Sequence, residues 1–319
     1  MIHTILKERI LLMDGAMGTS IQKYNLQESN FRGEEFKSHT VKLSGNYDLL
    51  NLIQPEIIQN IHQSYIEAGA DIITTNTFNS NIISQATYQC QGLVYRLNTE
   101  GARIAREVAD HSGRTVFVAG SIGPTGKALS LLPEAYREAD FNELLKTYRE
   151  QVEGLMDGGA DLLLVETVFD VLNAQAALSA IAHVQQKKAR NIPVMLSVTL
   201  NENGRTLSGQ TPEEIYSTIS SYPLLSFGLN CSFGSREMQI FIEKLSRSVP
   251  CYLSIYPNAG LPDKTGKYHE TQEHLASVMK DMGKRGLINI AGGCCGTTPE
   301  HIAAMAESIR GISPRLVKT

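Results

Sequence analysis

The sequence predicts a (β/α)8 TIM barrel, an α/β fold built as a single domain with insertions at the barrel mouth. Short and nearly continuous apolar runs recur eight times along the 319 residues, and helical patterns separate them. Such runs suit strands that are buried on both faces, as the strands of a parallel barrel are. A doubly wound open sheet is the alternative, but neither G-x-G-x-x-G nor G-x-x-x-x-G-K-[ST] occurs in the chain.

The eight runs predict strands within residues 10–17, 70–78, 115–124, 160–169, 192–200, 224–233, 251–260 and 286–296. The segments between them have helical patterns. In residues 55–69 several isoleucines share one helical face, with Pro55 in the first turn and Gly69 at the end. The last helix is expected to begin after Thr298, as its N-cap, and to stop at Gly311.

We expect one barrel domain over residues 1–319, with its core at about 8–311 and elaborations of the mouth or rim at 18–54 and 121–141. The net charge of −4 gives no electrostatic footprint for nucleic acid or for an anionic membrane surface. No apolar run approaches the ~18 residues that span a bilayer. The five cysteines are odd in number and irregularly spaced, which argues against a disulfide framework and favours the cytoplasm.

Three cysteines share the end of the predicted barrel where catalytic groups lie, the C-terminal ends of the strands. Cys231 ends the sixth run, and Cys294 and Cys295 end the eighth. Cys251 opens the seventh run at the opposite end, and Cys90 lies in the helical stretch after the second. Three thiolates with an open fourth position are typical of a catalytic zinc site. A vicinal disulfide, or three core cysteines without a role, are the alternatives. None of the eight histidines lies at a strand end.

Two carboxylates also end predicted strands, Asp14 the first and Glu166 the fourth. A metal with three thiolates is suited to binding a further thiol as thiolate, and the carboxylates could then hold an ammonium group. The glycine-rich turn that contains Gly15 could offer amides to a carboxylate. Together these features indicate an amino-acid thiol as substrate. Either carboxylate could instead be a helix cap or a structural acceptor, and Asn258 could close the zinc shell without substrate or only order a turn.

The sequence resembles the homocysteine-binding module of cobalamin-dependent methionine synthase, from about residue 8 to about residue 311. The resemblance rests on LLMDGAMGT, YDLLNLIQPEII, EAGADIITTNTFNSN, GGADLLLVETVFD, GRTLSGQT, FGLNCS, YPNAGLP and GGCCGTTPEHI. The separated N-C and G-G-C-C-G motifs are those of the wider homocysteine S-methyltransferase family. The resemblance implies a zinc-dependent barrel that binds homocysteine, with Cys231, Cys294 and Cys295 as ligands. It also assigns Asp14 and Glu166 to the amino-acid end of the substrate.

The leading expectation for function is methylation of zinc-bound homocysteine to methionine, with methylcobalamin supplied by a partner. The D-x-H-x-x-G motif of cobalamin modules is absent, so separate cobalamin-binding and methyltetrahydrofolate-binding modules or subunits are the expected partners. The chain would then be a separately encoded homocysteine subunit or an excised domain. The first alternative is a stand-alone transferase that uses S-methylmethionine or a similar small donor. The second is a zinc-stabilised binding barrel without activity.

Overall fold

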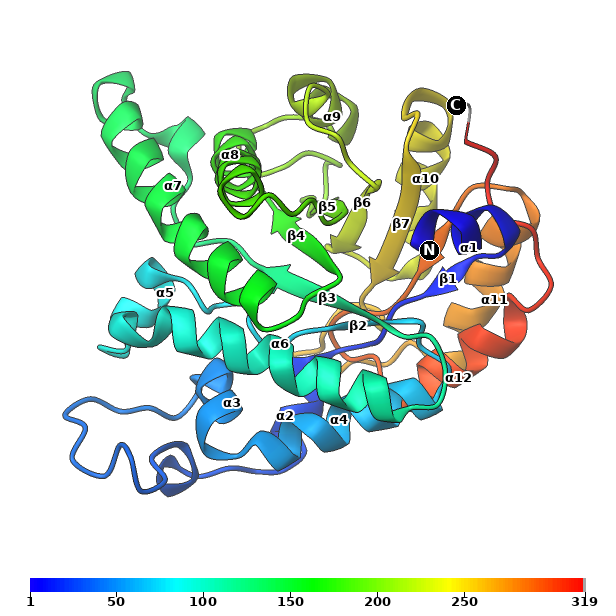
Figure 1. Ribbon diagram of the computed structural model, residues 1–319. Coiled ribbons are helices and arrows are strands. Elements are labelled where there is room, and N and C mark those ends of the chain that lie inside the picture. Colours follow the sequence, from blue (N-terminus) through cyan, green and yellow to red (C-terminus); the bar gives the residue numbers. More distant parts are fainter. Residues whose placement is uncertain (318–319) are drawn as a thin grey trace.

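The computed structural model describes residues 1–317 and shows eight parallel strands surrounded by helices (Figure 1). The strands are β1 (Leu11–Leu12), β2 (Ile72–Thr74), β3 (Phe117–Ile122), β4 (Leu162–Val168), β5 (Val194–Val198), β6 (Ser226–Cys231), β7 (Tyr252–Pro257) and β8 (Ile290–Ala291). They pair in the order β1-β8-β7-β6-β5-β4-β3-β2. A hydrogen bond from Asp71 N to Leu12 O (2.6 Å) and a bridge between Met13 and Ile72 join β2 back to β1. The predicted barrel is confirmed, and each strand lies within its predicted run.

Each strand is followed by one helix of the outer ring. These helices are α4 (Pro55–Glu67), α6 (Val94–His111), α7 (Glu134–Asp157), α8 (Val171–Lys188), α9 (Pro212–Ile219), α10 (Ser235–Ser248), α11 (Gln272–Lys284) and α12 (Pro299–Ser308). Shorter helices lie outside the repeat: α1 (Ile2–Glu8), α2 (Met17–Gln22), α3 (Leu50–Ile53) and α5 (Ile82–Ala86), with 3-10 turns η1 (Glu28–Phe31), η2 (Tyr47–Leu49), η3 (Gln91–Leu93) and η4 (Leu129–Leu131).

The predicted starts and ends of two helices, α4 and α12, are confirmed. Helix α4 has Pro55 in its first turn, and Gly69 follows its end with a φ of +107°, which glycine adopts at little cost. Helix α12 begins directly after Thr298, whose amide donates to His301 Nδ1 (3.3 Å). Gly311 has a φ of +73° three residues beyond the last helical residue.

The predicted elaboration at 121–141 is largely wrong. Strand β3 runs to Ile122 and α7 begins at Glu134, so the connecting segment is only 123–133, with η4 inside it. The first turns of α7 read EAYREADFNE, in which charged residues obscure the apolar spacing that marks a helix. Figure 1 shows α7 as a long green helix at the left edge of the barrel.

The predicted elaboration at 18–54 is present and covers one side of the barrel mouth. It is the blue segment at the lower left of Figure 1, and it includes η1, η2 and α3. Buried polar contacts tie it to the segment after β2. Asn46 and Gln85 exchange amide hydrogen bonds of 2.8 and 3.1 Å, and Ser80 Oγ donates to Asp48 Oδ2 (2.9 Å). The insertion is therefore a fixed wall of the mouth.

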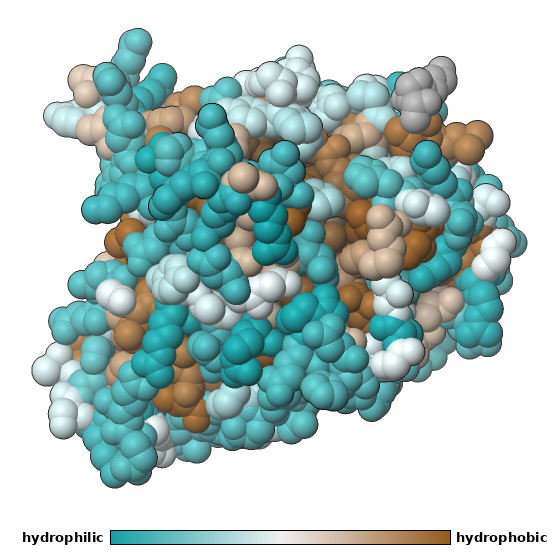
Figure 2. Space-filling model, in the orientation of Figure 1, coloured by the Kyte–Doolittle hydropathy of each residue, from teal (hydrophilic) through white to brown (hydrophobic). Residues whose placement is uncertain are grey.

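The apolar core has two layers, one between strands and helices and one inside the barrel. Alternation along β4 shows the division, because Leu162 and Leu164 belong to the inner layer while Leu163 belongs to the outer. Helix α1, which the sequence analysis did not predict, contributes Ile2 and Leu6 to the inner layer. Figure 2 shows a mostly hydrophilic outer surface in this view, with brown patches between the helices.

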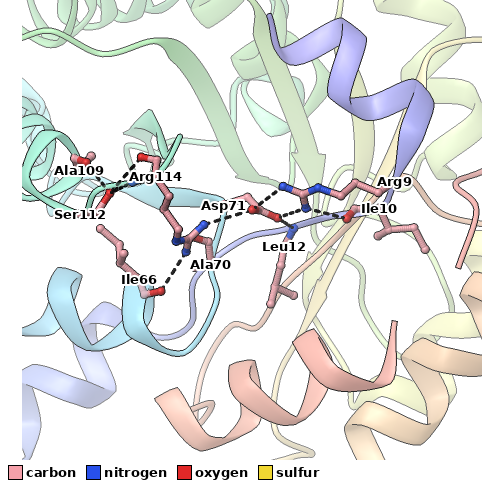
Figure 3. A network of polar contacts seen from close by, with 9 residues as sticks. All are labelled: Arg9, Ile10, Leu12, Ile66, Ala70, Asp71, Ala109, Ser112 and Arg114. Atoms are coloured by element: carbon pink, nitrogen blue, oxygen red, sulfur yellow. Dashed lines mark hydrogen bonds and ion pairs between the residues drawn. The ribbon is translucent and has the colours of Figure 1, made fainter. Parts of the chain in front are cut away.

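An ion-pair network joins the chain segments at the base of the barrel, opposite the C-terminal ends of the strands (Figure 3). The Asp71 carboxylate accepts from Arg9 (2.7 and 2.8 Å), from Arg114 (3.3 Å) and from the amide of Leu12 (3.0 Å). Arg114 also donates to Ile66 O at 2.9 Å. The network therefore fastens the closure between β1 and β2. Across residues 1–317, no helix is both long enough and apolar enough to cross a bilayer.

Candidate active site

A cavity of about 400 Å³ opens at the C-terminal ends of the strands. Its wall includes most of the residues predicted for the site: Asp14, Gly15, Glu166, Cys231, Cys294 and Cys295. The two carboxylates, the cysteines and the glycine-rich turn thus meet in one place, although they come from four different strands. Asn258 is buried nearby in the segment after β7 and does not line the cavity wall.

The sulfur atoms of Cys231, Cys294 and Cys295 form a cluster. Cys231 Sγ lies 3.4 Å from Cys294 Sγ and 3.7 Å from Cys295 Sγ, so no disulfide joins them. Three sulfurs bound tetrahedrally at ~2.3 Å from one zinc ion would lie roughly 3.8 Å apart. The two distances are near that spacing, and all three sulfurs lie within 4.8 Å of one another. Within residues 1–317 no fourth His, Cys, Asp or Glu joins this group, so a metal held here would keep an open position.

The two adjacent cysteines can both face the cluster because they lie beyond the strand. Strand β8 ends at Ala291, short of the predicted run, so the alternation of side chains no longer applies at 294–295. The turn is held by Cys294 N, which donates to Pro257 O (2.7 Å), and by Ala259 N, which donates to Cys295 O (2.9 Å). A Cβ on Gly293 would come within 2.4 Å of Thr297 Oγ1, so only glycine fits there.

The strand ends beside the cavity have an unusual backbone. Thr167, Cys231 and Ser232 have φ values of +59°, +56° and +60°, a region that costs non-glycine residues energy and is found at functional sites. The buried side chain of Asn230 holds two of these ends together. It accepts from Thr167 N (3.0 Å) and donates to Thr167 Oγ1 (2.8 Å). Asn230, a polar residue at a strand end, thus positions its neighbours.

The three cysteines of the cluster differ in pKa because they hydrogen-bond to one another. Hydrogen bonds with Cys231 and Cys295 raise the pKa of Cys294 well above its usual range. Hydrogen bonds from Cys231 and Cys294 lower the pKa of Cys295. Without a cation, one thiolate is therefore stabilised by two thiols that keep their protons. A divalent ion could replace those protons, and three soft sulfur ligands favour zinc over magnesium or calcium.

Asp14 and Glu166 are carboxyl groups in a poorly solvated place. Burial raises the pKa of Asp14 to about 8, although Thr74 donates to it from its amide (2.7 Å) and hydroxyl (3.1 Å). Burial also raises the pKa of Glu166 to about 7, although Ser121 Oγ donates to it (2.5 Å) and the neighbouring Tyr256 hydroxyl also lowers the pKa. Glu166 keeps some surface on the cavity while its carboxyl group lies deep in the barrel. In residues 1–317 neither carboxyl has an ion-pair partner, so both could accept a cation from outside.

The structure also shows where the glycine-rich turn at Gly15 and the side chain of Asn258 lie relative to the cavity. Gly15 lines the cavity, and a Cβ there would meet Thr297 and Tyr65 at 2.8 Å, so the turn requires glycine. The next amide, that of Ala16, already donates to Thr297 Oγ1 (3.2 Å) and is not free for a substrate. Asn258 Oδ1 is buried and has no hydrogen-bond partner among the described residues.

The sequence analysis missed several cavity residues, among them Ser121, Tyr256, Tyr47 and Asp48. Ser121 and Tyr256 lie at the ends of β3 and β7, where attention to strand ends alone could have found them. Tyr47 and Asp48 come from the insertion and begin the YDLLNLIQPEII motif of the family resemblance, but neither lies at a strand end. Burial raises the pKa of Asp48 to about 7.

The cysteines and histidines set aside by the sequence analysis do lie apart from the cluster. Cys251 precedes β7 at the base of the barrel, and its carbonyl accepts from Arg315 (2.9 Å). Cys90 is buried in the turn between α5 and η3, not within a helix. No histidine in residues 1–317 belongs to the cluster.

Comparisons with known proteins identify the family. The sequence model described as homocysteine S-methyltransferase matches residues 11–309. Among solved structures, the chain resembles the homocysteine methyltransferase MmuM from Escherichia coli. Its metallated form has 23% identity and a TM-score of 0.72, with 96% of this chain and 98% of that chain covered. Its apo form has 24% identity and a TM-score of 0.67, with 95% and 97% covered. At such identities the structural likeness shows the shared fold.

The fold alone would not indicate the chemistry, since barrels of this kind carry many activities. A 2-naphthoyl-CoA reductase complex also matches, with a TM-score of 0.57, 10% identity, and coverage of 89% of this chain and 47% of that chain. The family match is the decisive one, because it runs from the first strand to the last helix. The chain therefore belongs to the homocysteine S-methyltransferase family and is a methyltransferase.

Proposed function

We propose that the protein methylates the sulfur of homocysteine to form methionine, with methylcobalamin on a partner module or subunit as the methyl donor. Cys231, Cys294 and Cys295 would hold a zinc ion for this reaction. The observation that carries the proposal is the cysteine cluster, whose spacing fits three ligands of one tetrahedral zinc. The family membership supports homocysteine as the methyl acceptor.

Zinc bound at the cluster would supply positive charge that keeps a substrate thiol deprotonated near neutral pH. Residues of the chain would bind and orient the substrate. Asp14 and Glu166 can accept the ammonium group of the amino acid, since each is a buried carboxyl without a cationic partner in residues 1–317. Fixing both ends of the substrate holds its sulfur in one orientation, and such positioning lowers the barrier to displacement.

Asn258 is proposed to face the metal when no substrate is present. Its buried Oδ1 has no partner among the described residues, and an unsatisfied buried acceptor costs ~1–3 kcal/mol. Coordination to a metal would satisfy that atom. Gly15 is proposed to line the substrate position, because it lies in the cavity wall and packs too closely against Tyr65 and Thr297 to carry a side chain.

A second candidate keeps homocysteine as acceptor and uses a small sulfonium or ammonium donor such as S-methylmethionine. The observation that favours it is the cavity wall, which includes Tyr47, Phe78 and the buried carboxyl group of Asp48. Aromatic faces and a carboxylate both attract methylated cations. The third expectation, a barrel without activity, is set aside by the membership in a methyltransferase family.

A turnover assay with homocysteine and a panel of methyl donors tests the proposal. The zinc-loaded chain should slowly demethylate free methylcobalamin, and a cobalamin-binding partner should accelerate the reaction. Methyltetrahydrofolate alone should give no methionine, because no cobalamin-ligating motif is present in the sequence. Rapid turnover of S-methylmethionine without a partner would favour the second candidate. The Cys294→Ser variant is the control that should be inactive with every donor.

A further inference from the structure

The hydroxyl of Tyr256 is a polar group buried at the site with no hydrogen-bond partner among the described residues. Tyr256 is 3% exposed, comes from β7 and lines the cavity. Leaving such a group unpaired costs free energy, and native structures keep few of them. By contrast, the hydroxyl of the other fully buried tyrosine beside the cavity, Tyr65, contacts Ser20 Oγ at 3.1 Å. No acceptor in residues 1–317 therefore lies in good hydrogen-bond geometry to the Tyr256 hydroxyl, although Glu166 is close enough for the phenol to lower the pKa of its carboxyl group.

Glu166 lies next to Tyr256 in the cavity wall, where the phenol lowers the pKa of its carboxyl group, and one of its carboxyl oxygens lacks a donor within residues 1–317. Burial, and then the charges of Glu166, Cys294 and Cys231, raise the pKa of Tyr256 well above its usual range, so the phenol keeps its proton. Glu166 Oε1 accepts from Ser121 Oγ, whereas Oε2 has no donor among the described residues. An ionised carboxylate has about four acceptor positions, so it can accept from a second donor as well as from a ligand.

Ser197 is the other neighbour of the Tyr256 hydroxyl, but the proton of its own hydroxyl is already donated to Asn230. Ser197 Oγ donates to Asn230 Oδ1 at 2.8 Å, within the contacts that hold the ends of β4 and β6. It can only accept from Tyr256, and a neutral hydroxyl is a weaker acceptor than a carboxylate. When Glu166 is ionised, the carboxylate is therefore the preferred acceptor for the tyrosine.

We propose that Tyr256 is a positioning residue for Glu166. Its hydroxyl donates to the carboxylate when the substrate ammonium is bound, and together with Ser121 it fixes the direction in which Glu166 meets that ammonium. This inference rests on the proposed function, because it takes an amino-acid ammonium as the partner of Glu166. It assigns Tyr256 no contact with the metal and no proton transfer.

A double-mutant cycle tests the inference by homocysteine affinity, measured calorimetrically on zinc-loaded protein. Tyr256→Phe should weaken binding about tenfold, the loss typical of one hydrogen bond to a charged group. In a Glu166→Gln background the same change should alter affinity less than twofold, because residues that act through one another are not additive. Tyr252→Phe is the matched control on the same strand. Its hydroxyl faces His3 O at the base of the barrel, and affinity should be unchanged.

The analogue 4-mercaptobutanoate, which lacks the amino group, separates this role from a general effect on the site. Its affinity should be the same for the native chain and for Tyr256→Phe. The inference would be overturned if Tyr256→Phe reduced homocysteine affinity equally in the native and Glu166→Gln chains. It would also be overturned if the affinities for both ligands fell equally, or if the zinc content fell. Tyr256→Met, which also lacks the hydroxyl, gives the same comparison if the phenylalanine variant does not fold. A native chain that binds zinc but not homocysteine would instead overturn the proposed function, and the inference with it.

Discussion

Replacing Glu166 by glutamine removes one charge from the cavity and keeps the shape of the side chain. A buried carboxylate and an ammonium group about 4 Å apart attract by roughly 4 kcal/mol at an effective dielectric constant near 20. Part of this energy offsets the cost of burying the charge. The net loss should therefore be near ~1.5–3 kcal/mol, the usual value for a hydrogen bond to a charged group. Homocysteine affinity at pH 8 should fall by about ten- to hundredfold.

The loss should also depend on pH, with a sign that follows from the raised pKa of Glu166. A carboxyl with a pKa of about 7 is about nine-tenths ionised at pH 8 and about one-tenth ionised at pH 6. Only the ionised form attracts the ammonium group, so the advantage of the native chain is present above pH 7 and is lost as the pH falls. The ratio of the two affinities should shrink about tenfold between pH 8 and pH 6. Ionisation of the substrate thiol affects both proteins equally and leaves the ratio unchanged.

Calorimetric titration of zinc-loaded native and variant chains at the two pH values measures this ratio. Zinc content should be the same in both proteins, because Glu166 is not among the three residues grouped at the metal site. Glu28→Gln is the matched control. Glu28 accepts from the amides of Leu43 and Ser44 in the insertion, and it does not line the cavity. Equal affinity for native and Glu166→Gln at pH 8, or a ratio independent of pH, would refute the assignment of Glu166 to the ammonium.

Three further substitutions test separate parts of the structure. Cys294→Ser should lose most of its bound zinc by elemental analysis, whereas Cys251→Ser at the base of the barrel should retain it; similar zinc content in both would contradict the ligand set. Asn258→Ala should lose zinc to a chelator faster than the native chain without homocysteine and at the same rate with it, and equal rates in both conditions would remove its role. Asp71→Asn should lower the free energy of unfolding by about 1–2 kcal/mol, a modest figure because Arg9 is half exposed, and homocysteine affinity should not change.

Much of the site could be predicted because the functional groups of such barrels lie at the C-terminal ends of the strands. Cys231 and Cys294 are more than sixty residues apart, but the C-terminal ends of parallel barrel strands must share one mouth. The same rule placed Asp14 and Glu166 beside them. It needed only the order of strands, and strand order follows from the recurrence of apolar runs.

Features that depend on the path of irregular segments could not be predicted. Tyr47 and Asp48 reach the cavity because contacts such as Asp48 with Ser80 fold the insertion over the mouth, and no periodicity encodes those contacts. Helix α1 is short, and its apolar residues Ile2 and Leu6 do not indicate that they close the interior of the barrel. Tyr256 lies at a strand end and could have been named from the sequence, but the lack of a partner for its hydroxyl is visible only in three dimensions.

The central claim is that three cysteines hold a zinc ion whose open position receives the sulfur of homocysteine. X-ray absorption at the zinc edge measures the number of sulfur neighbours directly. The account predicts three sulfurs at ~2.3 Å with one lighter ligand in the free protein, and four sulfurs after homocysteine is added. A Cys294→Ser chain should not show this change. A sulfur count that stays at three in the presence of saturating homocysteine would contradict the claim.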